Sequence, residues 1–151
     1  MNPNYFERRP ILTEGEMRYF PILRTAIEAR WFLLFAKVRL ADIVTVKSDA
    51  LKRYPNVDKD EWWKIPENRE IMSKHVDFCV CASDTLKVSL IIELDDKSHD
   101  DPDRIKRDKN IDAIFTECKI RIMHLKYKDL RRNEKRLQEY ISEQLRPHLG
   151  Y

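Results

Sequence analysis

Residues 90–108, LIIELDDKSHDDPDRIKRD, place three carboxylates directly after an aliphatic run, with a lysine and a histidine close behind. The carboxylates belong to Glu93, Asp95 and Asp96. Like charges crowded at the end of a buried segment are unfavourable unless a cation shares them. Oxygen ligands of this kind suit Mg²⁺ or Mn²⁺ and not zinc. The stretch therefore predicts a divalent-cation site, and with it chemistry on a phosphate.

A further acid, Asp77, lies in the preceding apolar segment, HVDFCVCAS. The tetrapeptide SDTL that follows has the composition of a hairpin turn, so the two segments are expected to be antiparallel neighbours. Asp77 and Glu93 lie at similar distances from this turn, which brings them within about one pair of each other. Because alternate residues share a strand face, the first segment is expected to divide into His75, Asp77, Cys79 and Cys81 on one side and Val76, Phe78 and Val80 on the other.

Helices are expected near residues 13–30, 102–118 and 133–146, because apolar residues recur there at helical intervals. Thr13 and Glu16 have capping-box spacing, and Pro21 is a place where the first helix could kink or break. The segment FLLFAKVRLADIVTV predicts one or two strands, and KIRIMHL predicts another. This order predicts a central mixed β-sheet flanked by helices, an α/β (α+β) fold.

Composition limits the remaining choices. A chain of 151 residues with 36% charged and 42% hydrophobic residues predicts a single soluble domain over 1–151, with an irregular insertion at about 47–70. Two glycines provide no glycine-rich phosphate loop, which excludes P-loop and dinucleotide-binding classes. Three cysteines and an N-terminus without an apolar signal core favour the cytoplasm. A net charge of +3 permits nucleic-acid binding without arguing for it.

The pattern HVDF, a hairpin and then LIIELDDKSH resembles the PD-(D/E)XK nuclease superfamily, which has the restriction-endonuclease-like fold. More narrowly it resembles the Vsr-like branch and several uncharacterised bacterial domain families of unknown function. The likeness runs from about Ile11 to Leu130, and each motif is weak by itself, whereas their order and spacing are more specific. The matching positions are Asp77-Phe78, Glu93-Leu94-Asp95-Asp96, His99 and Arg107-Asp108.

The resemblance implies that Asp77 and Glu93 hold a divalent metal together with the carbonyl of Leu94. The superfamily's lysine normally follows the glutamate by two residues, where this chain has Asp95. Asp95 is then itself a candidate metal ligand, with His99 assisting protonation of the leaving group. Candidates for the missing positive charge are Lys97, Lys106 and Arg107, and Glu16 is the candidate acid from the first helix.

The expected function is that of a magnesium- or manganese-dependent endonuclease that hydrolyses phosphodiester bonds in DNA. Arg104, Lys106 and Arg107 would contact the backbone. One alternative is a catalytically degenerate nuclease-fold module that binds nucleic acid or a protein partner, and another is an interaction domain with a solvated acidic cluster. No membrane partner is expected, whereas RNA in place of DNA, and a homodimer, stay open.

Other chemically capable residues are given ordinary roles. Cys79 and Cys81 with His75 are expected to pack in the core, because residues alternating on one strand lie in line and no second cysteine pair exists. His124 is expected to be structural at a strand end. Trp62 and Trp63 could stack on bases or fill an apolar cleft.

Overall fold

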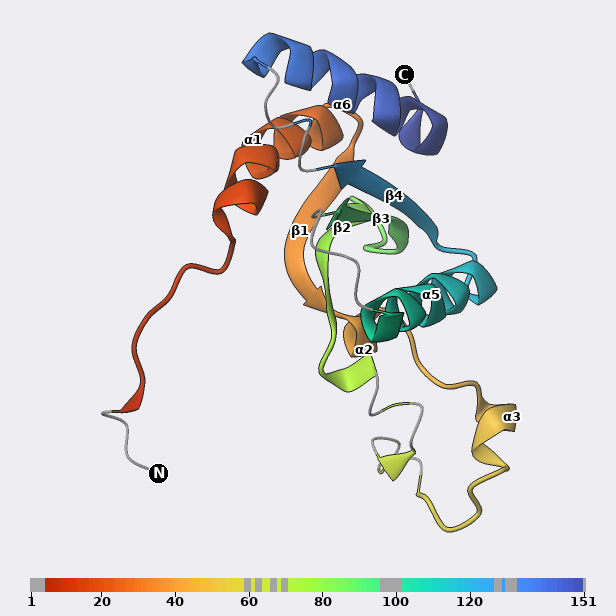
Figure 1. The fold of residues 1–151 in the computed structure, drawn as a ribbon. Helices are drawn as coiled ribbons and strands as arrows, with labels where there is room; N and C mark the ends of the chain where they lie inside the picture. The colour runs from red at the N-terminus through yellow and green to blue at the C-terminus, as the bar shows by residue number, and fades with distance from the viewer. Residues whose placement is uncertain are drawn as a thin grey trace.

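A computed structural model of the chain describes residues 5–58, 61, 64, 65, 68, 71–95, 102–126, 129 and 133–150, with the backbone alone over 102–109. None of the helices in these ranges is both long and apolar enough to cross a membrane. In chain order the elements are α1 (Glu14–Glu28), β1 (Phe32–Arg39), α2 (Leu40–Ile43), α3 (Ser48–Leu51), β2 (His75–Ala82), β3 (Val88–Asp95), α5 (Pro102–Glu117), β4 (Arg121–Lys126) and α6 (Glu134–Leu149) (Figure 1).

The four strands form one mixed sheet in the order β1-β2-β3-β4. β1, β2 and β3 are antiparallel neighbours, and the β2–β3 hairpin is the one that the sequence predicts. β4 runs parallel to β3, because the chain returns through the crossover helix α5 before it enters the sheet again. The mixed sheet with flanking helices confirms the predicted α+β class.

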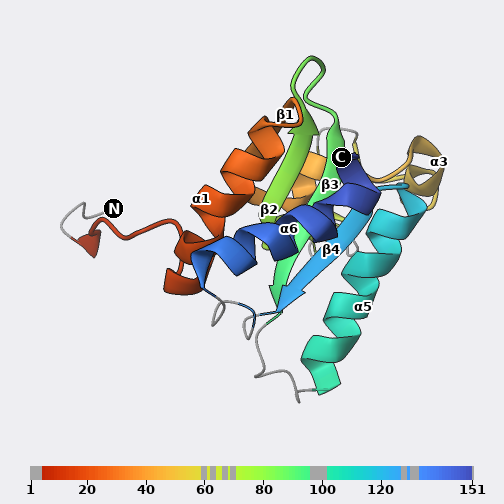
Figure 2. The ribbon, with the colours of Figure 1, turned by 90° about the horizontal axis from the view of Figure 1, so that it is seen from above.

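Helices cover both faces of the sheet (Figures 1 and 2). On one face, α1 and α6 pack against Phe78, Val80, Leu90 and Ile92. On the other face, α5 packs through Phe115 against residues that include Cys79, Cys81 and Ile91. Both cysteines are buried and free, which confirms their predicted packing role.

Helix α1 begins where its sequence signals place it. The Thr13 hydroxyl accepts from the Glu16 N–H, and the Glu16 carboxylate accepts from the Thr13 N–H at 2.8 Å, which completes the predicted capping box. Pro21 lies inside the helix without ending it. After β1 the chain forms one turn of helix, α2, and not a second strand: the Val44 N–H donates to Leu40 O.

An irregularity in β1 changes the expected alternation of the sheet. Lys37 has φ 55°, the left-handed region that a residue in a regular strand does not adopt. On one side of it, Ala36 and its partner Phe78 pack with α1 and α6, whereas on the other side Val38 and its partner Val76 pack with the α5 core. Val76 and Phe78, which alternation predicts on one face, thus pack in two different cores.

Candidate active site

Asp77 and Glu93 lie where the β2–β3 ladder ends. Phe78 pairs with Ile92, and the next positions along the two strands are Asp77 and Glu93, within the one-pair range that their similar distances from the turn predict. Here the Asp77 carboxylate replaces a backbone acceptor, because its Oδ2 accepts the Leu94 N–H at 2.9 Å. The carboxyl of Glu93 is in hydrogen-bonding contact with that of Asp77. The two acids that the sequence singles out therefore do meet.

The environment of Glu93 disfavours its negative charge. Burial raises the pKa of Glu93 to about 9, and the neighbouring charge of Asp77 acts in the same direction. Lys37 opposes this shift but does not cancel it. At neutral pH the Glu93 carboxyl therefore holds a proton unless a further cation enters. Two oxygen-bearing side chains that cannot both be charged without one are suitable ligands for a hard divalent ion.

Lys37 brings a positive charge to the carboxylate pair. It reaches these acids from β1. Its neighbours Ala36 and Val38 pair with Phe78 and Val76, which places Lys37 opposite Asp77. Its Nζ donates to Glu16 Oε1 and, at 3.2 Å, to Asp77 Oδ1. Burial alone would lower the pKa of Lys37, but the hydrogen bonds and charges of the two carboxylates outweigh burial and raise it. Lys37 is therefore a fixed positive charge.

Glu16, the acid predicted from the first helix, joins the site through Lys37. Its side chain is buried in the first turn of α1, with one oxygen on the Thr13 N–H and the other on Lys37. Both oxygens are thus occupied, and the helix start is attached to β1. The structure supports Glu16 as a residue that positions Lys37.

The Asp95 side chain contacts a histidine that the sequence pattern does not place beside it. Its Oδ1 lies 3.0 Å from His124 Nδ1, and both side chains are about half exposed. His124 pairs with Glu93 across the parallel β3–β4 register, so it lies beside the carboxylate pair and not in a purely structural place. Alternation puts His124 on the same face of β4 as Ile122, but which residues of β3 lie beside it depends on the β3–β4 pairing.

A cleft of about 450 Å³ lies on the α5 side of the sheet, and Asp77, Glu93, Asp95 and His124 open onto it. Strands contribute one wall, and α5 contributes the other through Ile111, Asp112 and Phe115. The polar side chains that line it from the strands are His75, Asp77, Glu93, Asp95 and His124, with Lys74 just before β2.

Several predicted site residues lie outside the described part of the chain. Asp96, Lys97 and His99 fall in the range 96–101, and Trp62 and Trp63 are likewise not described. Arg104, Lys106 and Arg107 lie on the backbone of α5, but their side chains are not described. Within the described ranges, no three His, Cys, Asp or Glu side chains are grouped to hold a metal. Of the predicted metal ligands, the structure brings together the side chains of Asp77 and Glu93.

Comparison with known proteins gives a family but no activity. No curated protein and no solved structure matches the chain significantly. A family model does match residues 8–145, a range that takes in α1, all four strands and most of α6. The chain therefore belongs to the family described as Protein of unknown function (DUF2726).

Proposed function

We propose that this protein is a nuclease that depends on a divalent metal and hydrolyses phosphodiester bonds in DNA. The observation that supports this most strongly is the contact between Asp77 and Glu93, at the point where two strands diverge and burial opposes the charge of Glu93. The resemblance of the sequence to the PD-(D/E)XK pattern agrees with this geometry. Mg²⁺ or Mn²⁺ held there would polarise the scissile phosphate and lower the pKa of the attacking water.

The chain's own residues do the remaining work. Asp77 and Glu93 would hold the ion with the Leu94 carbonyl, since the Asp77 oxygens keep a free lone pair beside their bonds to Lys37 and Leu94. Lys37 adds positive charge at the edge of the site, next to where the phosphate oxygens would lie. Asp95 and His124 form the adjoining polar wall of the cleft.

A second candidate is a nuclease-fold module that binds nucleic acid without cutting it. One observation favours it: Lys37 already bridges Glu16 and Asp77, so the site is partly neutralised from within the chain. Asp95 at the usual lysine position points in the same direction.

The deciding experiment combines metal binding with cutting. Calorimetric titration with Mg²⁺ and Mn²⁺ should show binding to the wild-type protein, and Asp77→Asn and Glu93→Gln should abolish it together with metal-dependent cutting of plasmid and single-stranded DNA. Glu139→Gln, on the exposed surface of α6, is the matched control and should behave as wild type. Ion binding without any cutting would favour the second candidate. A wild-type protein that neither binds the ions nor cuts DNA would refute the proposal.

A further inference from the structure

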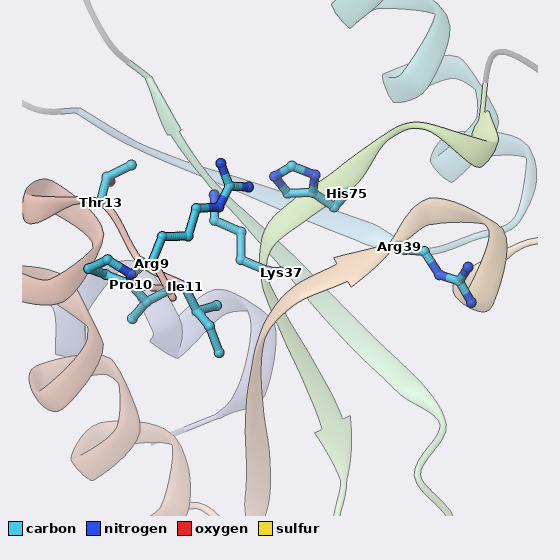
Figure 3. Close-up of a pocket in the computed structure, with 8 residues that line it drawn as sticks. Arg9, Pro10, Ile11, Thr13, Lys37, Arg39 and His75 are labelled. Carbon is cyan, nitrogen blue, oxygen red and sulfur yellow. The ribbon is translucent and has the colours of Figure 1, made fainter. Parts of the chain in front are cut away.

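A second cleft, of about 460 Å³, lies on the other side of Lys37. Residues 9–13, before and at the start of α1, form one wall, and the ends of β1 and β2 form the other. Figure 3 shows Arg9 and Lys37 directed into the space that His75 borders. The residues that line it include four with basic side chains and none with an acidic one: Arg9, Pro10, Ile11, Leu12, Thr13, Lys37, Arg39 and His75.

The four basic side chains are not equally available to a ligand. Lys37 is engaged by Glu16 and Asp77. Arg39 forms two hydrogen bonds of 2.9 Å with Asp42, and in Figure 3 it points away from Arg9. Arg9 forms no ion pair with any residue in the described ranges. Its guanidinium, which cannot lose its charge, is thus the free cation of the cleft.

The segment that carries Arg9 has the composition of a nucleic-acid contact. In residues 5–11, aromatic and aliphatic side chains are interspersed with two arginines and one glutamate, Glu7, and all of these residues are exposed. Tyr5 and Phe6 are 82% and 69% exposed, and Ile11, which lines the cleft, is 76% exposed. Exposed apolar side chains beside guanidinium groups suit a polymer that has charged phosphates and flat bases. The segment leaves α1 and runs clear of the helices (Figure 1).

The cleft adjoins the candidate active site through Lys37 and His75. Lys37 lines it, while the Lys37 Nζ lies 3.2 Å from Asp77 Oδ1. His75 lines both this cleft and the one on the α5 side. A strand that crosses Lys37 and His75 would therefore contact both the Asp77–Glu93 pair and the cleft that Arg9 lines.

We propose that this cleft binds a backbone phosphate of a nucleic-acid strand, with Arg9 as its phosphate contact and Ile11 as an apolar wall for the adjoining sugar or base. The placement of this cleft beside the scissile phosphate rests on the proposed nuclease function. The binding of a strand in the cleft does not rest on it, because phosphate contacts form without metal or cutting.

The test measures affinity without metal. Fluorescence anisotropy with a labelled 24-nucleotide strand and its duplex, in EDTA and over 50–200 mM NaCl, compares wild type with Arg9→Ala and Arg9→Glu. Arg8→Ala is the matched control, since Arg8 is an exposed neighbour that does not line the cleft. Loss of one phosphate contact should weaken binding by about 3- to 10-fold and lower the salt slope by about one. Arg9→Glu should weaken it further, and Arg8→Ala by less than about twofold.

Each outcome decides the proposal. If Arg9→Ala and Arg8→Ala weaken binding equally, or if wild type binds no strand, the cleft is not a phosphate site. If 10 mM inorganic phosphate displaces the strand from wild type as readily as from Arg9→Ala, Arg9 makes no specific contact and the proposal fails. A selective Arg9 effect in a protein that never cuts would leave this cleft standing and remove the nuclease function. Metal-dependent cutting of DNA without a selective effect of Arg9→Ala would support the nuclease function and refute this cleft as a phosphate site.

Discussion

Two basic residues of β1, Lys37 and Arg39, lie two positions apart and form ion pairs that differ in exposure and in the elements they join. Lys37 bonds to Glu16 and Asp77, and its side chain is 20% exposed, against 7% and 19% for its partners. Arg39 bonds to Asp42, with the two side chains 67% and 48% exposed. The contacts of Lys37 join α1, β1 and β2, whereas Arg39 and Asp42 lie three positions apart in the sequence, at the start of α2.

The difference shows that hydrogen-bond geometry does not measure the importance of an ion pair. Arg39 makes two hydrogen bonds of 2.9 Å to Asp42, and Lys37 likewise makes two hydrogen bonds to carboxylates, so geometry does not rank the two. Exposed pairs gain little, because water and salt already stabilise the separated charges. Removing one member of a buried pair leaves the other uncompensated in a poorly solvated place, which is strongly unfavourable. Lys37 should therefore control both the stability and the chemistry of the site.

The largest effect is expected for Lys37→Met, which keeps the side-chain volume but removes the charge. It leaves Glu16 and Asp77 without their shared cation, so the free energy of unfolding should fall by roughly 1–3 kcal/mol, discounted for partial exposure. Urea unfolding at pH 7 measures the loss. If Lys37 also acts on the phosphate, metal-dependent cutting should disappear under conditions in which the variant is folded.

Lys47→Met is the matched control for this change. Lys47 pairs with Glu117 on the surface, and both side chains are about 70% exposed. The same substitution there should leave the unfolding midpoint unchanged. Equal unfolding midpoints for Lys47→Met and Lys37→Met would show that the Glu16–Lys37–Asp77 bridge stabilises the protein no more than an exposed ion pair does.

A smaller effect of opposite sign is expected for Glu93→Gln without metal. Burial raises the pKa of Glu93 from 4.5 to about 9, so between these values the folded protein binds a proton that the unfolded chain does not. Wild-type stability should therefore fall as pH rises through this window, and the amide removes that loss. The variant should be more stable by about 1 kcal/mol at pH 8, with the gap narrowing toward pH 5.

Thermal and urea unfolding from pH 5 to pH 9 in EDTA check this prediction. Glu139→Gln, an exposed carboxylate on α6, should show no such pH-dependent gain. A Glu93→Gln variant that is less stable than wild type at every pH would mean that the Glu93 charge is favourably compensated in the folded protein.

Most of the fold could be predicted because its signals are local. The capping box fixes the start of α1, and the SDTL turn fixes the β2–β3 hairpin and therefore the meeting of Asp77 and Glu93. Apolar periodicity located α5 and α6. In each case neighbouring residues contain the information, so tertiary packing has little to add.

Lys37 and His124 could not be assigned in this way. Lys37 reaches the acids because its backbone is left-handed within a strand, and strict alternation cannot express such a change. His124 lies beside Glu93 because the parallel β3–β4 register depends on how α5 packs across the sheet. Both positions follow from contacts between elements distant in sequence, which one chain's local pattern does not show.

The smallest effect is expected for Arg39→Gln, which completes the comparison with Lys37. Because its pair with Asp42 is exposed, the unfolding midpoint should stay at the wild-type value, at 50 mM and at 500 mM NaCl. Arg39 also lines the basic cleft but is held by Asp42, so its loss should weaken strand binding less than Arg9→Ala does. Asp42→Asn separates the two causes, since it frees Arg39 and should strengthen binding slightly at low salt. If Arg39→Gln instead destabilises the protein as much as Lys37→Met, exposure is not what distinguishes the two pairs, and the role given to the buried bridge loses its physical basis.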